Sequence, residues 1–160
     1  MTTQKVFVIG FQKTGTTSLG DALTLLGYRV CGSLGVTDTN IALTARDLVF
    51  EHAERFDAFQ DNPWPIYYRE LDIRYPGSKF VLTLRPSGDW IRSLIRHFGD
   101  DSTPMREWIY GSGSPFGNEE EYMARFEQHN RDVLEYFADR TGDLLIMSLG
   151  EGDGWSQAHL

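Results

Sequence analysis

The sequence contains one cysteine, no long apolar run and no excess of basic residues. Because Cys31 stands alone, no internal disulfide can form. No stretch approaches the roughly 18 apolar residues that suggest a membrane span, and the chain does not open on a signal-peptide pattern. We therefore expect a cytoplasmic protein that does not associate with a membrane.

Basic charge is also scarce, since 15 Lys and Arg residues stand against 23 Asp and Glu residues and the net charge is −8. This balance argues against general binding to nucleic acid or to anionic lipid, both of which need a basic surface. The four histidines and the single cysteine show no metal-ligand spacing, so no metal site is expected. An anionic ligand would have to be held by a local cluster of donors.

What the chain does contain is enough apolar material for a packed core, with 41% hydrophobic residues among 160. We predict a single domain over residues 1–160. Short apolar strands alternate with helical patterns, which predicts an α/β three-layer sandwich around a mainly parallel sheet of about 4–5 strands. The expected strands span residues 5–9, 28–31, 56–60, 79–84 and 143–149. The expected helices span residues 16–26, 41–56, 66–75 and 105–110, together with one that begins at Pro86 and ends near His97 and a long one after Asn118, where Glu121 completes a capping box.

The first strand ends in a glycine-flanked turn, G-F-Q-K-T-G-T-T at residues 10–17, and a helix follows. Such a layout brings backbone N–H groups and a helix N-terminus together at one point, where an anion can bind. An ordinary tight turn is the simpler interpretation. The crowding of donors in this one turn favours an oxyanion site instead. The candidate binding residues are Gly10, Gln12, Lys13, Thr14, Gly15, Thr16, Thr17 and Ser18.

The position of the lysine indicates which anion. The nucleotide-triphosphate loop reads G-x-x-x-x-G-K-[ST], but here Thr16 occupies the lysine position and the lysine lies inside the loop, at Lys13. The stretch K-T-G-T-T-S resembles the 5′-phosphosulfate loop of the sulfotransferases. That resemblance implies a fold related to the P-loop nucleotide-triphosphate hydrolases and a requirement for 3′-phosphoadenosine-5′-phosphosulfate, with 3′,5′-bisphosphoadenosine as the product. A sulfuryl group in transfer carries less charge than a phosphoryl group, so no metal ion is expected.

A second element, L-R-P-S-G-D-W-I-R-S-L, follows a clear strand and places Ser93 eight residues after Arg85. Periodicity alone describes only a polar strand end and a helical hydroxyl. In sulfotransferases an arginine and a serine at this spacing hold the 3′-phosphate of the cofactor. The resemblance therefore assigns Arg85 and Ser93 to cofactor binding.

Asp61, at the end of an expected strand, is the leading candidate for the general base that removes the acceptor's proton. The family more often has histidine or glutamate there. Two alternatives stay open, a magnesium-binding aspartate as in a kinase and a residue that only caps the turn before Pro63. His97 is a further acid–base candidate, although a histidine near a helix C-terminus has a structural explanation. His52 and His129 are interpreted as structural.

The sequence thus predicts a sulfotransferase that moves a sulfuryl group to a hydroxyl or amine of a small-molecule acceptor. Two departures from the family stand out: Ser18 replaces a tryptophan that often stacks on adenine, and relatives generally continue further beyond the last strand. The alternatives are a P-loop small-molecule kinase and a non-catalytic nucleotide-binding module. The sequence does not identify the acceptor. Residues 99–117 are expected to determine which acceptor is used, and a homodimer stays open.

Overall fold

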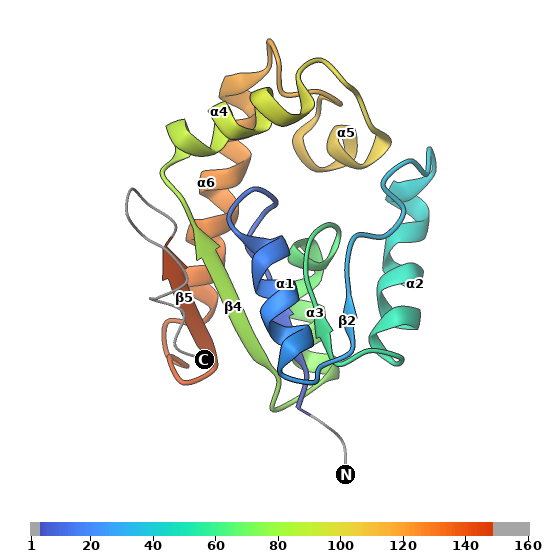
Figure 1. The fold of residues 1–160 in the computed structure, drawn as a ribbon, viewed down its shortest axis with the longest axis vertical. Helices are drawn as coiled ribbons and strands as arrows, with labels where there is room; N and C mark the ends of the chain where they lie inside the picture. Colours follow the sequence, from blue (N-terminus) through green and yellow to red (C-terminus); the bar gives the residue numbers. More distant parts are fainter. Residues whose placement is uncertain (1–3, 149–160) are drawn as a thin grey trace.

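A computed structural model describes residues 4–148 of the chain. Its centre is a sheet of five parallel strands in the order β2-β3-β1-β4-β5, which confirms the predicted α/β fold (Figure 1). The strands are β1 (Val6–Val8), β2 (Val30–Cys31), β3 (Ala58–Phe59), β4 (Lys79–Leu84) and β5 (Leu144–Ser148). Because every strand runs the same way, their carboxyl ends meet at one edge of the sheet.

Helices cover both faces of this sheet, as the alternating pattern predicts. They are α1 (Thr16–Leu25), α2 (Ile41–Ala53), the 3-10 helix η1 (Trp64–Tyr67), α3 (Tyr68–Arg74), α4 (Ser87–Phe98), α5 (Pro104–Tyr110) and α6 (Glu119–Tyr136). α1 packs on one face through Leu19 and Leu23, whereas α2, α3 and α6 pack on the other. No helix among the described residues is long and apolar enough to cross a membrane.

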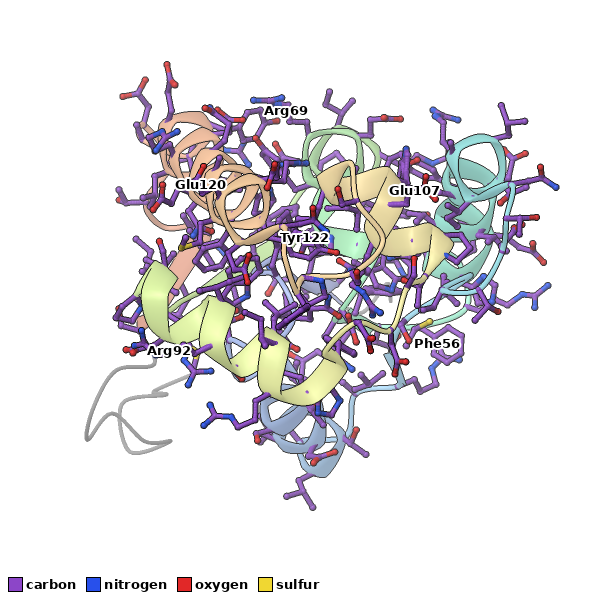
Figure 2. All side chains as sticks on the ribbon, turned by 90° about the horizontal axis from the view of Figure 1, so that it is seen from above. Phe56, Arg69, Arg92, Glu107, Glu120 and Tyr122 are labelled. Atoms are coloured by element: carbon purple, nitrogen blue, oxygen red, sulfur yellow. The ribbon has the colours of Figure 1, made fainter. Side chains whose placement is uncertain are left out.

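A second hydrophobic cluster lies at the carboxyl edge of the strands, where α4 and α5 pack against α2 and α6 (Figures 1 and 2). Trp90 of α4 stacks on Phe126 of α6 with ring centroids 4.1 Å apart. Tyr122 lies at its centre, stacked on Tyr110, and its hydroxyl donates to the Ser112 carbonyl over 2.8 Å (Figure 2). This cluster holds the carboxyl-edge helices at fixed positions above the sheet.

The structure corrects several predicted elements. The segment predicted as one helix over residues 66–75 is η1 followed by α3, and several strands are shorter than expected. The capping box is wrong, because Asn118 makes no side-chain cap and instead donates through Nδ2 to the Ser114 carbonyl over 3.0 Å. Glu119, rather than Glu121, accepts a hydrogen bond there, from the Gly117 N–H. The last residue of the predicted final strand, Leu149, lies outside the described residues.

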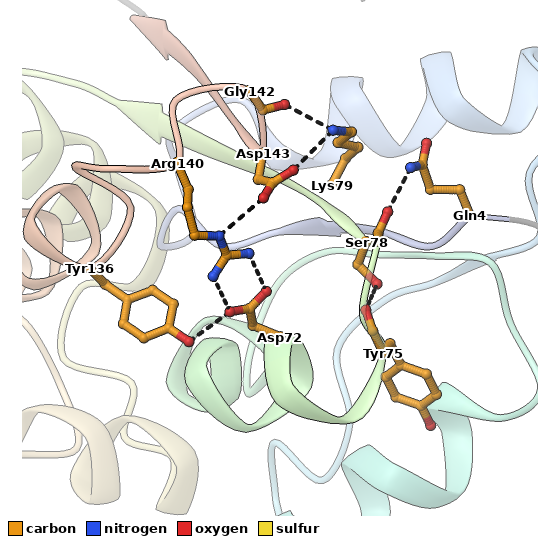
Figure 3. Close-up of polar contacts among 10 residues, drawn as sticks. Gln4, Asp72, Tyr75, Ser78, Lys79, Tyr136, Arg140, Gly142 and Asp143 are labelled. Carbon is orange, nitrogen blue, oxygen red and sulfur yellow. Dashed lines mark hydrogen bonds and ion pairs between the residues drawn. The ribbon is translucent and has the colours of Figure 1, made fainter.

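At the opposite edge of the sheet, a polar network ties α3 to the segment between α6 and β5 (Figure 3). Asp72 accepts hydrogen bonds from both terminal nitrogens of Arg140, over 2.6 and 2.7 Å, and one from the Tyr136 hydroxyl over 2.6 Å. Arg140 also reaches Asp143, which in turn accepts from Lys79 at the start of β4. Paired charges therefore hold α3, the start of β4 and the segment before β5 together at this edge.

His129 of α6 joins the core to the carboxyl end of β1. Its Nε2 lies 2.7 Å from the Ile9 carbonyl, to which it must donate because a carbonyl only accepts, and its ring stacks on Phe11 at 4.3 Å. The imidazole is buried, and burial lowers its pKa to about 4. This confirms the structural interpretation of His129.

The buried His129 predicts how stability depends on pH. An unfolded histidine has a pKa near 6.5 and the folded one is held lower, so the unfolded state binds a proton first. The free energy of unfolding should therefore fall as pH drops below about 6.5, by about 2 kcal/mol at about pH 5. Urea titrations between neutrality and mild acid measure this loss. In a His129→Gln variant, which keeps an N–H donor but does not titrate, the slope should flatten, and an unchanged slope would contradict the assignment.

Candidate functional site

A cavity of about 520 Å³ opens at the carboxyl edge of the sheet, between the loop after β1, the ends of β3 and β4, and the helices α4 and α5. Almost all of the predicted site residues line it together. They are Gln12, Lys13, Gly15, Thr16, Thr17, Ser18, Asp61, Arg85, Ser93 and His97. The two predicted elements, far apart in sequence, therefore face one space.

Gly10 and Thr14, which were also predicted to bind the cofactor, are buried and do not appear in the cavity wall. The Thr14 hydroxyl lies 2.5 Å from both the Phe11 carbonyl and the Thr83 hydroxyl. A Cβ at Gly10 would come within 1.9 Å of Thr83 Oγ1 and 2.6 Å of its carbonyl oxygen, so only glycine fits there. Both residues hold the loop close to β4.

The carbonyl groups of the loop are tied by side chains from other elements. Arg85 donates through Nη1 to the Lys13 carbonyl over 3.0 Å, and Trp90 donates through Nε1 to the Gln12 carbonyl over 2.8 Å. The Phe11 carbonyl accepts from Thr14, as described above. Each of these hydrogen bonds fixes a carbonyl oxygen that could otherwise turn its negative charge toward the cavity.

The N–H groups of the same loop are left available. Among the described residues, the backbone N–H groups of residues 13–18 donate to no carbonyl. The next N–H along the chain, that of Leu19, donates to the Gly15 carbonyl over 3.1 Å. Lys13 and Gly15 have positive φ angles of 65° and 91°. Such left-handed turns arrange successive N–H groups in a concave nest that suits an anion, and α1 begins immediately afterwards.

Positive side chains add to this nest. Lys13 and Arg85 both line the cavity, and neither forms an ion pair with a carboxylate of the described residues. The Lys13 ammonium lies 5.7 Å from the centre of the Phe98 ring, on the far wall. These two cations and the free N–H groups are the donors that an anion site requires on an otherwise acidic protein.

Asp61 lies two residues after the end of β3 and carries the carboxylate of this cavity wall. Its φ is 73°, and Oδ1 accepts a hydrogen bond from the N–H of the next residue, Asn62, over 2.7 Å. Burial raises the pKa of the carboxyl above its usual value, whereas the Asn62 bond and the charge of Lys13 act in the opposite sense. A carboxylate so placed can accept a proton near Lys13.

The remaining predicted candidate, His97, lies in the last turn of α4 and also lines the cavity. Its ring meets the Phe98 ring edge-on at 4.6 Å. No group of three or more His, Cys, Asp or Glu side chains suited to a metal ion occurs in the part of the chain that the structure describes.

Sequence reasoning missed part of the cavity wall. Residues 99–117 were expected to carry specificity, but the individual side chains were not named, and Asn62 and Phe98 gave no signal because their neighbours in space are distant in sequence. The missed lining residues are Ser33, Val36, Asn62, Phe98, Thr103, Met105 and Arg106.

Comparison with known proteins adds the family. A family model described as a sulfotransferase domain matches residues 5–115, which include the glycine loop, Asp61, Arg85 and Ser93. A search of curated proteins found no match. The match covers more than half of the chain and agrees with the parallel fold and with both sequence elements. The chain therefore belongs to the sulfotransferase family and is a transferase that moves sulfuryl groups.

Proposed function

We propose that the protein transfers a sulfuryl group from 3′-phosphoadenosine-5′-phosphosulfate to a hydroxyl or amine of a small molecule. The observation that carries this proposal is the set of N–H groups at residues 13–18, flanked in one cavity by Lys13 and Arg85, all without a partner of opposite charge or a carbonyl acceptor in the described part of the chain. Two separate anion-binding elements suit a donor that bears phosphate at two positions. A cavity of about 520 Å³ is of the size that small-molecule sites usually have.

The residues present fit this donor. The N–H groups of residues 13–18, with the hydroxyls of Thr16 and Thr17, would hold the 5′-phosphate, and Arg85 with Ser93 would hold the 3′-phosphate. Arg85 uses Nη1 on the Lys13 carbonyl, which leaves its other nitrogens to bind an anion. Ser18 occupies the position of the common adenine-stacking tryptophan, so the adenine contact stays unassigned.

The bound donor supplies an activated sulfuryl group, and the chain's own residues supply position and charge. The acceptor hydroxyl forms its O–S bond as the bond from sulfur to the bridging phosphate oxygen breaks, and its proton passes to Asp61. Lys13 neutralises the charge that develops on the released phosphate oxygen. The fixed loop holds the reacting groups in line without further reorganisation.

A first prediction concerns the donor. Because the cavity offers free N–H groups and two cations, 3′,5′-bisphosphoadenosine should raise the melting temperature of the protein without any metal ion. Thermal shift with and without a chelator measures this. Stabilisation by ATP that requires magnesium, together with no effect of the bisphosphate, would favour a kinase and overturn the proposal.

A second prediction concerns Lys13. Lys13→Met keeps the length of the side chain but removes its charge, so kcat should fall by about 10²–10³-fold, the usual effect of losing one electrostatic donor. Lys79→Met is a matched control, because Lys79 lies at the start of β4, at the opposite edge of the sheet. A Lys13→Met protein that turns over like the control would rule out the assigned role.

A third prediction separates catalysis from binding at Asp61. Asparagine tolerates the positive φ of 73° and keeps the size of the side chain but cannot accept the proton, so Asp61→Asn should lower the transfer rate by ~10²–10⁴-fold. The affinity for 3′,5′-bisphosphoadenosine, measured by calorimetry, should hardly change. Since burial raises the pKa of Asp61, activity of the unmodified protein should decline on acidification at a higher pH than an ordinary aspartate would dictate.

Asp100→Asn serves as the control for this substitution, because Asp100 is exposed and lies outside the cavity. A transfer rate that survives in Asp61→Asn, with unchanged binding, would leave Asp61 as a turn-capping residue and move the role of base to His97. A loss of metal-dependent nucleotide binding would instead support the magnesium alternative.

A further inference from the structure

The cavity wall opposite the glycine loop contains a buried guanidinium that neither phosphate element uses. Arg106 of α5 lines the cavity, yet it is only 4% exposed. Its Nε donates to the Gly113 carbonyl over 3.0 Å and its Nη2 to the Asp101 carbonyl over 2.7 Å. Its plane covers the Phe98 ring, with Cζ 4.2 Å from the ring centre. The group is therefore fixed in place by α5 and its flanking loops.

This cation lacks the partner that a buried charge normally has. None of the ion pairs among the described residues includes Arg106, although the chain carries an excess of carboxylates. By contrast Arg140, which is more exposed, is neutralised by Asp72 and Asp143. Two carbonyl groups and the neighbouring Tyr122 hydroxyl contact the Arg106 guanidinium, but these groups are neutral and leave its charge uncompensated, which is costly in a buried place. An anion in the cavity would compensate it.

The geometry also limits how far that anion lies from the reacting centre. Lys13 and Arg106 approach the same ring, Phe98, at 5.7 Å and 4.2 Å, so the two cations can be no farther apart than the sum of these distances. The carboxylate of Asp61 interacts with Lys13, which places it at the loop end of the cavity. Between the two ends the wall is partly apolar, from Met105 and Phe98. One small molecule can therefore span from Lys13 to Arg106.

We propose that the acceptor is a hydroxy acid, whose hydroxyl lies beside Lys13 and Asp61 and whose carboxylate is bound by Arg106. An aromatic or short apolar spacer would lie along Phe98. This inference rests on the proposed function, because it assigns the acceptor end of the same cavity. Arg106 is then the residue that selects acceptors by charge. A fixed guanidinium binds an acceptor that carries a carboxylate far better than one that carries a neutral carboxamide in its place.

The test compares two probes of equal shape, 4-hydroxybenzoate and 4-hydroxybenzamide, by calorimetry on the protein saturated with 3′,5′-bisphosphoadenosine. The unmodified protein should bind the carboxylate at least about tenfold more tightly than the amide, the effect of one charged hydrogen bond. In Arg106→Met this preference should vanish, with the affinity for the amide retained. Arg106→Lys should keep part of it, because the charge remains but the planar fork is lost.

The matched control is Arg92→Met, because Arg92 lies on the outer side of α4 with 68% of its side chain exposed (Figure 2). Equal weakening of both probes in Arg106→Met would show that Arg106 only supports α5, and the inference would be wrong. Equal affinity of the two probes for the unmodified protein, or no binding of either, would overturn it without any variant. Failure of the bisphosphate itself to bind would count against the proposed function instead.

Discussion

The site depends on how the first loop is hydrogen-bonded: in the described structure its carbonyl groups accept bonds from side chains, whereas its N–H groups are left free. Arg85 after β4 donates to the Lys13 carbonyl, and Trp90 on α4 donates to the Gln12 carbonyl. Just before the loop, His129 on α6 donates to the Ile9 carbonyl. A loop that had to satisfy its own carbonyls would turn some of them toward the anion. The surrounding elements therefore shape the proposed anion site as much as the loop does.

This dependence explains why the carboxyl-edge cluster is so aromatic. Trp90 can reach the Gln12 carbonyl only if α4 is held firmly above β1, and its stacking on Phe126 provides that support. Phe11 fills the space beneath the loop and stacks on His129. Packing in this cluster thus fixes the orientation of the loop's backbone dipoles. We expect looser packing there to disturb the site before it unfolds the protein.

The parts of the fold and the site that sequence could predict are those encoded by short-range spacing. The strand, loop and helix around Lys13, and the arginine and serine at fixed separation after β4, are local patterns, and both face the cavity as expected. The Asn118 capping box failed because the Asn118 side chain bonds instead to the Ser114 carbonyl, four residues earlier in the preceding turn. Arg106 was not foreseen, because its partners Phe98, at the end of α4, and Asp101 and Gly113, in the turns on either side of α5, belong to no recognisable motif.

The charge distribution reconciles an acidic chain with anionic ligands. A net charge of −8 gives a surface that repels anions at long range, so attraction must come from groups within a few ångströms, where screening by solvent is weak. Lys13, Arg85 and Arg106 line one cavity and form no ion pair with a carboxylate of residues 4–148, while exposed arginines such as Arg29 and Arg46 are paired. Pairing at the surface and lack of pairing in the cavity together make the cavity a local positive region. Asp61 lies in the same wall: burial raises the pKa of its carboxyl, while the hydrogen bond from the Asn62 N–H and the charge of Lys13 act in the opposite sense.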